Sequence, residues 1–275
     1  MKMRRWSVAL GLCGLACVSH AACDSGLAGR MNTKLHPERA LDAERAACKP
    51  WPGVLGRSIV VLPLPRPSRT EPGVIEFDLD VLVVQQADNG NTERSTITSR
   101  LFEENVLIDD AVHIDDIRID TARYALAPEA RAFGVRVRYS GSSRANPYAN
   151  ETLSLYVPQG EHLRKVLSGL ELSLDRGEWD TRCVGSSEQM RGSLSTAPTR
   201  SNGYADLQLH RAVSAGHSAL IDGECVEQPQ TSSFDTVLLR FDGKRYALPH
   251  MADGGKKRRE ITKPAGGSRR AAGGG

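Results

Sequence analysis

The stretch that decides the fold is Ile75-Glu76-Phe77-Asp78-Leu79-Asp80-Val81-Leu82-Val83. Apolar and acidic side chains alternate along it, and alternate side chains of an extended strand point to opposite faces of a sheet. The pattern therefore predicts a strand with one buried face and one wet face. Asp88-Asn89-Gly90-Asn91 follows, and Asn-Gly favours the positive φ angles of a tight hairpin turn. A return strand is expected over 94–102.

The same period of two recurs along most of the remaining chain. Further strands are expected at 117–120, 133–139, 153–157, 170–175, 188–195, 204–213 and 235–241. Turns are expected at Asn202-Gly203, Asp222-Gly223 and Asp242-Gly243, and 161–168 is ambiguous between a strand and a helical turn. Many short strands without a βαβ rhythm predict an all-β fold with an antiparallel, β-sandwich-like domain. A small or irregular β-propeller is the alternative.

The segment before this domain has a different composition. Residues 37–48 predict a short helix, because Pro37 suits a first helical turn, alanine is abundant and Pro50 ends the pattern. A stiff, extended connector is expected at Pro63, Pro65 and Pro67. We therefore expect a signal peptide at 1–21, an N-terminal helical segment at 22–56, the antiparallel β domain at 57–251 and a disordered basic tail at 252–275.

The first 21 residues read as an export signal. Basic residues near the N-terminus precede an uncharged, apolar-biased run over 6–18, and 19–21 supplies a Ser-His-Ala cleavage pattern. The run is shorter than the about 20 apolar residues of a membrane-spanning helix, and no later segment is long enough. We expect a periplasmic or secreted protein without a transmembrane span. The alternative is a lipid anchor on Cys23 or Cys17, each of which follows an alanine.

The cysteines fit export. Cys13 and Cys17 lie in the signal, which leaves Cys23, Cys48, Cys183 and Cys225. An even number in an oxidising compartment favours disulfides, and the pairing with the shorter loops is Cys183–Cys225 and Cys23–Cys48. Each bridge would contribute about 3–4 kcal/mol. The other two pairings and buried free thiols stay open. The mature chain contains no CxxC or paired Cys/His spacing, so no zinc site is expected.

The net charge of +3 hides a division along the chain. Residues 1–21 carry three basic and no acidic residues, and 256–275 carry seven basic and one acidic, so 22–255 carry a net charge of −6. A nucleic-acid-binding domain is expected to be basic itself, so we expect no nucleic-acid partner. The basic tail could make weak contact with an anionic surface, but we interpret it as a solvated tail without a partner.

Catalytic and metal-binding patterns are absent from the sequence. It contains no G-x-S-x-G, H-E-x-x-H, P-loop or G-x-G-x-x-G pattern. Asp206, His210, Ser214 and His217 could be imagined as a hydrolase triad, but nothing marks the serine as activated. The acidic residues over 109–120 match no EF-hand loop, and we interpret them as solvated loop acids rather than calcium ligands. No catalytic residue, metal ligand or cofactor is therefore predicted.

Two groups of charged residues and one tyrosine are candidate binding residues. We interpret the charged groups as cross-strand pairs or wet strand faces rather than as a binding surface. Tyr148 lies in a polar loop, 142–150, that could serve recognition, and we interpret it as an ordinary connection whose tyrosine covers the core edge. The charged groups are Glu76, Asp78 and Asp80, and Arg136 and Arg138.

Two segments resemble known proteins. They are Arg131-Ala132-Phe133-Gly134-Val135-Arg136-Val137 leading into 142–156, and Gly203-Tyr204-Ala205-Asp206-Leu207 with Leu239-Arg240-Phe241-Asp242-Gly243-Lys244-Arg245-Tyr246. Together they resemble uncharacterised exported bacterial proteins of unknown function. The second segment also resembles one blade edge of integrin-like propellers, but it lacks the calcium-binding aspartate pattern of such blades. Neither resemblance implies an activity or a functional residue.

The expected function is that of an exported bacterial envelope protein that acts as a non-catalytic binding or inhibitory module on an envelope protein or polymer. Export, the all-β scaffold, the disulfides and the lack of a catalytic pattern lead to this expectation. The alternative is a periplasmic hydrolase whose catalytic residues are brought together only by the fold.

Overall fold

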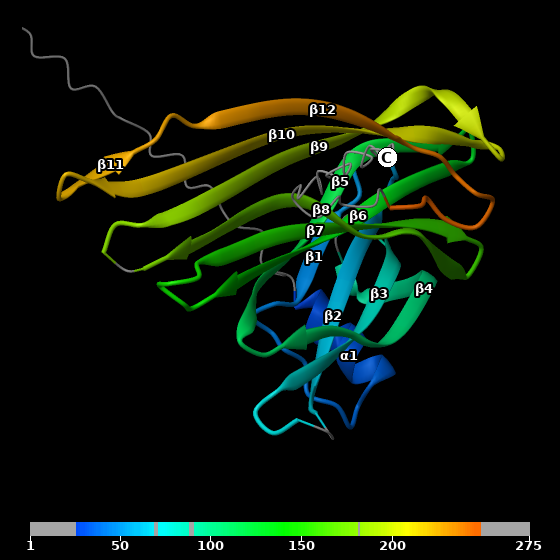
Figure 1. The fold of residues 1–275 in the computed structure, drawn as a ribbon. Coiled ribbons are helices and arrows are strands. Elements are labelled where there is room, and N and C mark those ends of the chain that lie inside the picture. Colours follow the sequence, from blue (N-terminus) through cyan, green and yellow to red (C-terminus); the bar gives the residue numbers. More distant parts are fainter. Residues whose placement is uncertain (1–25, 69–70, 88–90, 181, 249–275) are drawn as a thin grey trace, which may run out of the picture.

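The computed structural model describes residues 26–68, 71–87, 91–180 and 182–248 (Figure 1). They form one short helix, α1 (Leu27–Leu35), and one twelve-stranded sheet. The strands are β1 (Ala47–Pro50), β2 (Arg57–Pro67), β3 (Ile75–Ala87), β4 (Asn91–Asp109), β5 (Val112–Ala127), β6 (Ala130–Gly141), β7 (Tyr148–Gln159), β8 (His162–Trp179), β9 (Gly185–Ser201), β10 (Tyr204–Ile221), β11 (Glu224–Glu227) and β12 (Thr231–Leu239). The predicted all-β fold with a short N-terminal helix is confirmed, and its single sheet is antiparallel except where β4 meets β8 in parallel. The propeller alternative is wrong, because the strands join in one sheet and not in separate blades.

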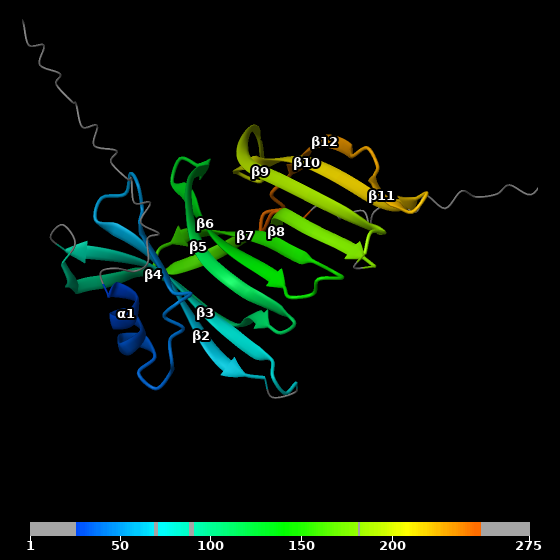
Figure 2. The same ribbon diagram turned by 90° about the vertical axis from the view of Figure 1, so that its left-hand side faces the viewer.

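The sheet folds over itself into layers. Its order is β1-β2-β3-β4-β8-β7-β6-β5, and β9 and β10 continue from β8, with β11 and β12 both beside β10. Figure 2 shows α1 with β2–β4 on one side, β5–β8 in the middle and β9–β12 on the other side. The middle strands therefore have a neighbouring layer on each face.

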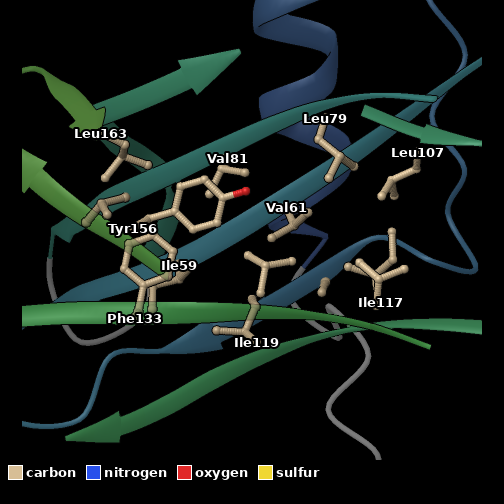
Figure 3. Close-up of a cluster of buried hydrophobic side chains, with 14 of the residues drawn as sticks. Ile59, Val61, Leu79, Val81, Leu107, Ile117, Ile119, Phe133, Tyr156 and Leu163 are labelled. Atoms are coloured by element: carbon tan, nitrogen blue, oxygen red, sulfur yellow. The ribbon is translucent and has the colours of Figure 1, made fainter. Parts of the chain in front are cut away.

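The first core lies between the β2–β3 layer and the middle strands. In Figure 3, Ile59, Val61 and Val81 lie opposite Phe133 and Tyr156, whose stacked rings have centroids 5.7 Å apart. All five are at most 1% exposed. Burying each such side chain contributes about 1.5–3 kcal/mol.

The second core lies on the opposite face of the middle strands. Leu153, Leu155 and Leu170 pack there against Leu207 and Leu209 of β10. The chain after β12 closes this core with an aromatic cluster at its rim, where Phe241 lies between the rings of Tyr204 and Tyr246. The middle strands thus pack against a layer on each face. This packing fixes the position of β8, whose free edge is described below.

The helix of the N-terminal segment lies at 27–35 and not at 37–48 as predicted. Leu27, Ala28 and Met31 are buried against β2 and β3, and the chain from His36 onward turns before β1 begins at Ala47. Side chains in this turn bind other elements: Arg39 donates to Asp78 and to the Leu64 carbonyl. Helix propensity is a weak preference, and these tertiary contacts override it.

Strand β3 is buried on both faces, so its predicted wet face is wrong. Asp80 is 0% exposed, forms a hydrogen bond with His36 at 2.7 Å and an ion pair with Arg100 at 2.8 Å. Asp78 is 3% exposed and pairs with Arg39. The predicted cross-strand pairing of these acids is confirmed by Arg66 of β2, which pairs with Glu76. Buried carboxylates need such partners, because losing water is costly for a charge.

The remaining expectations for the chain path have mixed outcomes. The proline connector is the buried strand β2, and 161–168 lies mainly in β8. Asn202-Gly203 and Asp222-Gly223 are turns with positive φ at both residues, as predicted. β3 and β4 pair as a hairpin, but the turn at 88–90 lies outside the described residues, as do the expected signal at 1–21 and the tail from 252 onward.

The predicted Cys183–Cys225 disulfide is present and joins the chain between β8 and β9 to β11. Cys48 in β1 is also disulfide-bonded, whereas its expected partner Cys23 lies outside the described residues.

None of the helices in the described ranges has the length and apolar character needed to cross a membrane.

Candidate functional site

One edge of β8 has no neighbouring strand over its middle third. This edge pairs with β4 only where Arg100 lies opposite His162, and with β9 only from Ser173 onward. Between these points, the turn after β12 makes the contacts that hold the edge: Tyr246 donates its backbone N–H to the Val166 carbonyl at 2.7 Å. A cleft lies here between β4, β8 and this turn.

The cleft exists because β4 bends. Leu79 of β3 pairs with Glu103, but Phe77 pairs with Leu107, so β4 carries two extra residues over this span. Asn105 has a φ of 49°, a left-handed conformation that asparagine tolerates better than most residues. Its N–H donates to Asp78 at 2.7 Å. The buried carboxylate thus fixes the bulge, which is a common device for bending a strand.

The inner part of the cleft is a cavity of about 190 Å³ beside the first core. Leu79 and Leu107 form one wall, and Val137 and Tyr156 form the other. Figure 3 shows Leu79, Leu107 and Tyr156 projecting into the space between the two layers. The polar residues of the lining are Thr152, Ser154, Lys165 and Ser168. The cavity thus has apolar side chains from β3, β4 and β6 and polar side chains from β7 and β8.

The outer part of the cleft is a chamber of about 590 Å³ that shares Lys165 and Ser168 with the inner cavity. Glu103 of β4 and the turn residues Asp242, Arg245, Tyr246, Ala247 and Leu248 complete its lining. The chamber is within the size range of ligand sites, about 300–1,000 Å³, whereas the inner cavity is below it. The two hollows adjoin at Lys165 and Ser168.

Three side chains link β4 to the middle strands at the junction of the two parts. Tyr156 donates to Glu103 at 2.9 Å, Lys165 forms an ion pair with the same carboxylate, and the Lys165 ammonium lies 5.6 Å from the Tyr156 ring centroid. Burial, together with the nearby Glu103 charge, raises the pKa of Tyr156 well above its ordinary value. The phenol therefore stays protonated and acts as a hydrogen-bond donor, not as a nucleophile.

This arrangement suits holding a ligand. Apolar walls favour an apolar group, and the polar residues at the junction can orient a second, polar part. Ordinary nucleophile–base pairs require a serine, cysteine or lysine next to a base. At the cleft, Lys165 is engaged by Glu103, and the Ser154 hydroxyl accepts the Gly169 N–H at 3.0 Å.

The residues of the imagined hydrolase triad lie in β10 but do not come together. Asp206 is 2% exposed and accepts a hydrogen bond from Thr199 at 2.7 Å. His210 is exposed and contacts the Thr236 hydroxyl at 3.0 Å. One side chain faces the interior and the other faces solvent, so they cannot form the acid–base part of a triad with Ser214.

The acids at 109–120 are in or next to β5, and several of them form ion pairs with arginines. Asp109 pairs with Arg45 and also contacts His113, and Asp120 pairs with Arg136. The prediction of loop acids is therefore wrong in location, because most of these residues belong to a strand. In the part of the chain that the structure covers, no three His, Cys, Asp or Glu residues are grouped to hold a metal ion.

The two arginines of the second charged group, Arg136 and Arg138, differ in their burial and in their contacts. Arg136 lies between Asp120 and Glu151, at 2.6 Å from each, and is half-buried. Arg138 is exposed and has a longer contact, 3.8 Å, with Asp115. The interpretation of cross-strand pairing is confirmed for Arg136. Because the Arg136 guanidinium is already paired with two carboxylates, it has little remaining capacity to bind a charged ligand.

Tyr148 begins β7 at the end of the predicted loop. The loop is tied to the end of β8 by backbone hydrogen bonds from Gly177 to the Pro147 carbonyl and from Trp179 to the Ala145 carbonyl. Burial raises the pKa of Tyr148, and the Glu171 charge adds to the increase. This position agrees with the interpretation of an ordinary connection whose tyrosine covers the core edge.

A second hollow, of about 470 Å³, lies on the surface of β9, β10 and β12. Its residues include His210, Phe234 and the Arg211–Asp235 ion pair. Phe234 is 82% exposed and stands on one sheet face without an opposing layer. The hollow therefore encloses a ligand less than the β4–β8 cleft does.

Sequence reasoning missed every residue that lines the cleft. Leu79, Val137 and Tyr156 look like ordinary inward-facing positions of alternating strands. Two signals were available: Lys165 interrupts the apolar residues of 163–167, and the polar run Glu103-Glu104-Asn105 interrupts β4. Neither signal indicates that the two strands diverge at these points, because strand pairing is not encoded locally.

Comparison with known proteins assigns no relative to the chain. No family model matches it, and neither the curated proteins nor the solved structures contain a match.

Proposed function

We propose that this chain is a non-catalytic binding protein of the bacterial envelope, and that its ligand has an apolar segment which enters the β4–β8 cleft. The observation that carries the proposal is a cavity of about 190 Å³ with apolar side chains on two walls, which adjoins a larger chamber at the unpaired edge of β8. Apolar walls with a few polar groups beside them are typical of sites that bind small molecules.

The location outside the cytoplasm is part of the proposal. It is supported by the Cys183–Cys225 disulfide, because such cross-links persist mainly in oxidising compartments. The export signal and the resemblance to uncharacterised exported bacterial proteins remain predictions that point the same way. The hydrolase alternative loses support, since Asp206 and His210 lie in different environments and bind different partners.

A calorimetric titration with decanoate tests the cleft as the binding site. Thr152 lines the inner cavity from β7, so Thr152→Phe should fill it and weaken binding at least about tenfold. Thr231→Phe places the same side chain on exposed β12 and should bind as the wild type does. Both variants should keep the circular dichroism spectrum of a folded sheet, because phenylalanine is a good strand former.

A second cavity-filling variant keeps the test decisive if the first one misfolds. Val106 lines the cavity from the opposite wall, and Val106→Phe should have the same effect as Thr152→Phe. Wild-type affinity in a folded, cavity-filled variant would show that decanoate binds elsewhere. Absence of saturable binding by the wild type would remove the proposal itself.

A further inference from the structure

We propose that the ligand of the cleft is a single-chain amphiphile with an anionic head group, held with its chain in the inner cavity and its head group beside Arg245. This inference rests on the proposed function, and it adds the chemical class of the ligand. Two features carry it: the shape of the inner cavity and the charge balance of the outer chamber.

The shape of the inner cavity selects a slender chain. Its volume of about 190 Å³ is too small for a drug-sized molecule, for which pockets of about 300–1,000 Å³ are usual. Leu79, Val135 and Val137 supply no hydrogen-bonding group to a guest. A peptide would have to bury unpaired backbone N–H and C=O groups at these walls, which is costly. An alkyl chain has no such groups and gains from every methylene it buries, by about 0.8 kcal/mol.

The acidic side chains of the outer chamber already have partners. Glu103 accepts the Tyr156 hydroxyl and pairs with Lys165. Asp242 accepts the backbone N–H groups of Lys244 and Arg245 at 2.6 and 2.7 Å. Glu103 is therefore engaged through both of its oxygens, whereas Asp242 uses Oδ1 for both of its contacts.

Arg245 is the basic residue of the chamber that could bind an anionic head group. Its side chain is exposed at the chamber, and it takes part in none of the ion pairs formed by the described residues. Arginine binds carboxylates and phosphates through a planar set of N–H donors. The chamber thus offers an exposed guanidinium to an anionic head group, close to Asp242, whose pKa the backbone N–H groups of Arg245 and Lys244 and their positive charges lower.

The arrangement of the two hollows also suggests which end of the ligand lies in each of them. The inner cavity and the chamber meet at Lys165 and Ser168, and Arg245 belongs to the chamber alone. With the chain in the cavity, the adjoining chamber is the place where a head group reaches Arg245. The ammonium of Lys165 lies at the junction and adds positive charge along the path, although Glu103 neutralises most of it.

The test compares three decyl ligands that share a chain and differ in the head group: decanoate, decyl phosphate and neutral decanol. Each is titrated below its micelle concentration into the purified wild-type protein. We expect at least one anionic ligand to bind about tenfold more tightly than decanol, because a charge-assisted hydrogen bond is worth about twice a neutral one. Stronger binding of decanoate would indicate fatty acids, and stronger binding of decyl phosphate would indicate lysophospholipid-like ligands.

Arg245→Gln should abolish this preference by weakening the binding of the anionic ligands to the level of decanol. Arg240→Gln is the matched control, because Arg240 is exposed and does not line either part of the cleft. Arg245→Lys should retain part of the preference, since it keeps the charge.

Equal affinities of the wild type for the anionic and neutral ligands would overturn the head-group assignment but leave the binding cleft in place. A preference that survives Arg245→Gln would overturn the role of Arg245. If none of the three ligands binds, the proposed function fails, and this inference fails with it.

Discussion

Arg136 shows how much the position of one side chain matters in this sheet. Its guanidinium contacts both Asp120 of β5 and Glu151 of β7, and it is half-buried. Burial by itself lowers the pKa of Arg136, but the hydrogen bonds and charges of the two carboxylates raise it overall. The residue joins three neighbouring strands through charge-assisted bonds, which are shorter and stronger than neutral ones.

We predict that Arg136→Gln lowers the free energy of unfolding by about 1–3 kcal/mol, because it leaves two partly buried carboxylates without their cation. Arg138→Gln should change it by less than about 0.5 kcal/mol, since its contact is long and exposed. Urea denaturation of the two variants measures the difference. Equal and small effects would mean that the Arg136 contacts contribute no net stability.

The same contacts predict an acid sensitivity. Burial alone would raise the pKa of Asp120, but the Ala122 N–H and Arg136 lower it below its ordinary value of 3.8. The pKa of Asp78 is also lowered, because the effects of the Asn105 N–H and of Arg39 outweigh the effect of burial, which raises it. A carboxyl whose pKa is lower in the folded state stabilises the fold above its unfolded pKa, and the stabilisation is lost as the pH falls through the folded value.

We therefore expect the melting temperature to fall steeply as the pH drops below about 4. Asp120→Asn should melt at a lower temperature than the wild type near neutral pH and should show a shallower decrease in acid. Melting curves at a series of pH values check this. An unchanged acid slope in Asp120→Asn would show that this carboxyl titrates alike in the folded and unfolded chain.

At the scale of elements, α1 depends on docking. Nine residues make too short a helix to persist alone, and Gly26 at its start provides no side-chain cap. The apolar residues Leu27 and Met31 are four positions apart, so they share the face that packs on β2 and β3. Tertiary packing, and not helix propensity, places the helix at 27–35.

Met31→Ala should lower the free energy of unfolding by about 2–3 kcal/mol, because it leaves a cavity beside β2. Gly29→Ala should raise it by about 0.5–1 kcal/mol, since Gly29 is exposed within the helix and an added methyl group meets no atom within 4 Å. Chemical denaturation of both variants tests the docking. A negligible effect of Met31→Ala would mean that α1 is not packed on the sheet in solution.

The elements that were predicted well are those with a clear local pattern. The alternation of 133–139 and of 153–157 and the Asn-Gly and Asp-Gly turns are local signals, and the structure confirms them. Strand β2 carries three prolines and still pairs along its length with β3. Pairing with β3 and packing on both faces make this segment a strand, although its prolines predicted a connector. The wet face expected for β3 failed for the same reason: α1 and the turn after it cover that face.

At the scale of the whole molecule, the β9–β12 layer reaches beyond the middle strands (Figure 1). The Cys183–Cys225 disulfide ties the start of β9 to β11 within this layer. Many residues of β11 and β12 are exposed, so packing alone gives this part of the sheet less support than the cores give the middle strands.

We predict that replacing both Cys183 and Cys225 with serine lowers the free energy of unfolding by about 3–4 kcal/mol. Hydrogen exchange should increase in β9–β11 more than in the middle strands. The reduced wild type is the control and should match the double variant. Protection that stays unchanged across β9–β11 would show that the bridge adds nothing to the order of this layer.

The cleft belongs to this largest scale, which is why the sequence did not predict it. Glu103, Lys165 and Arg245 come from three distant parts of the chain and meet because β4 bends away from β8 and the turn after β12 fills only part of the gap. The prediction of a binding protein without a catalytic pattern came from the composition and motifs. The location of the site follows from strand pairing alone, and pairing between distant strands has no local signature.

The most direct test of the cleft as a binding site is a crystal structure of the protein with 10-bromodecanoate. We predict an anomalous bromine peak in the inner cavity, among Leu79, Leu107 and Val137, with the carboxylate on the side of Arg245. A bromine peak at the hollow beside Phe234, or one in the outer chamber with the inner cavity empty, would contradict it.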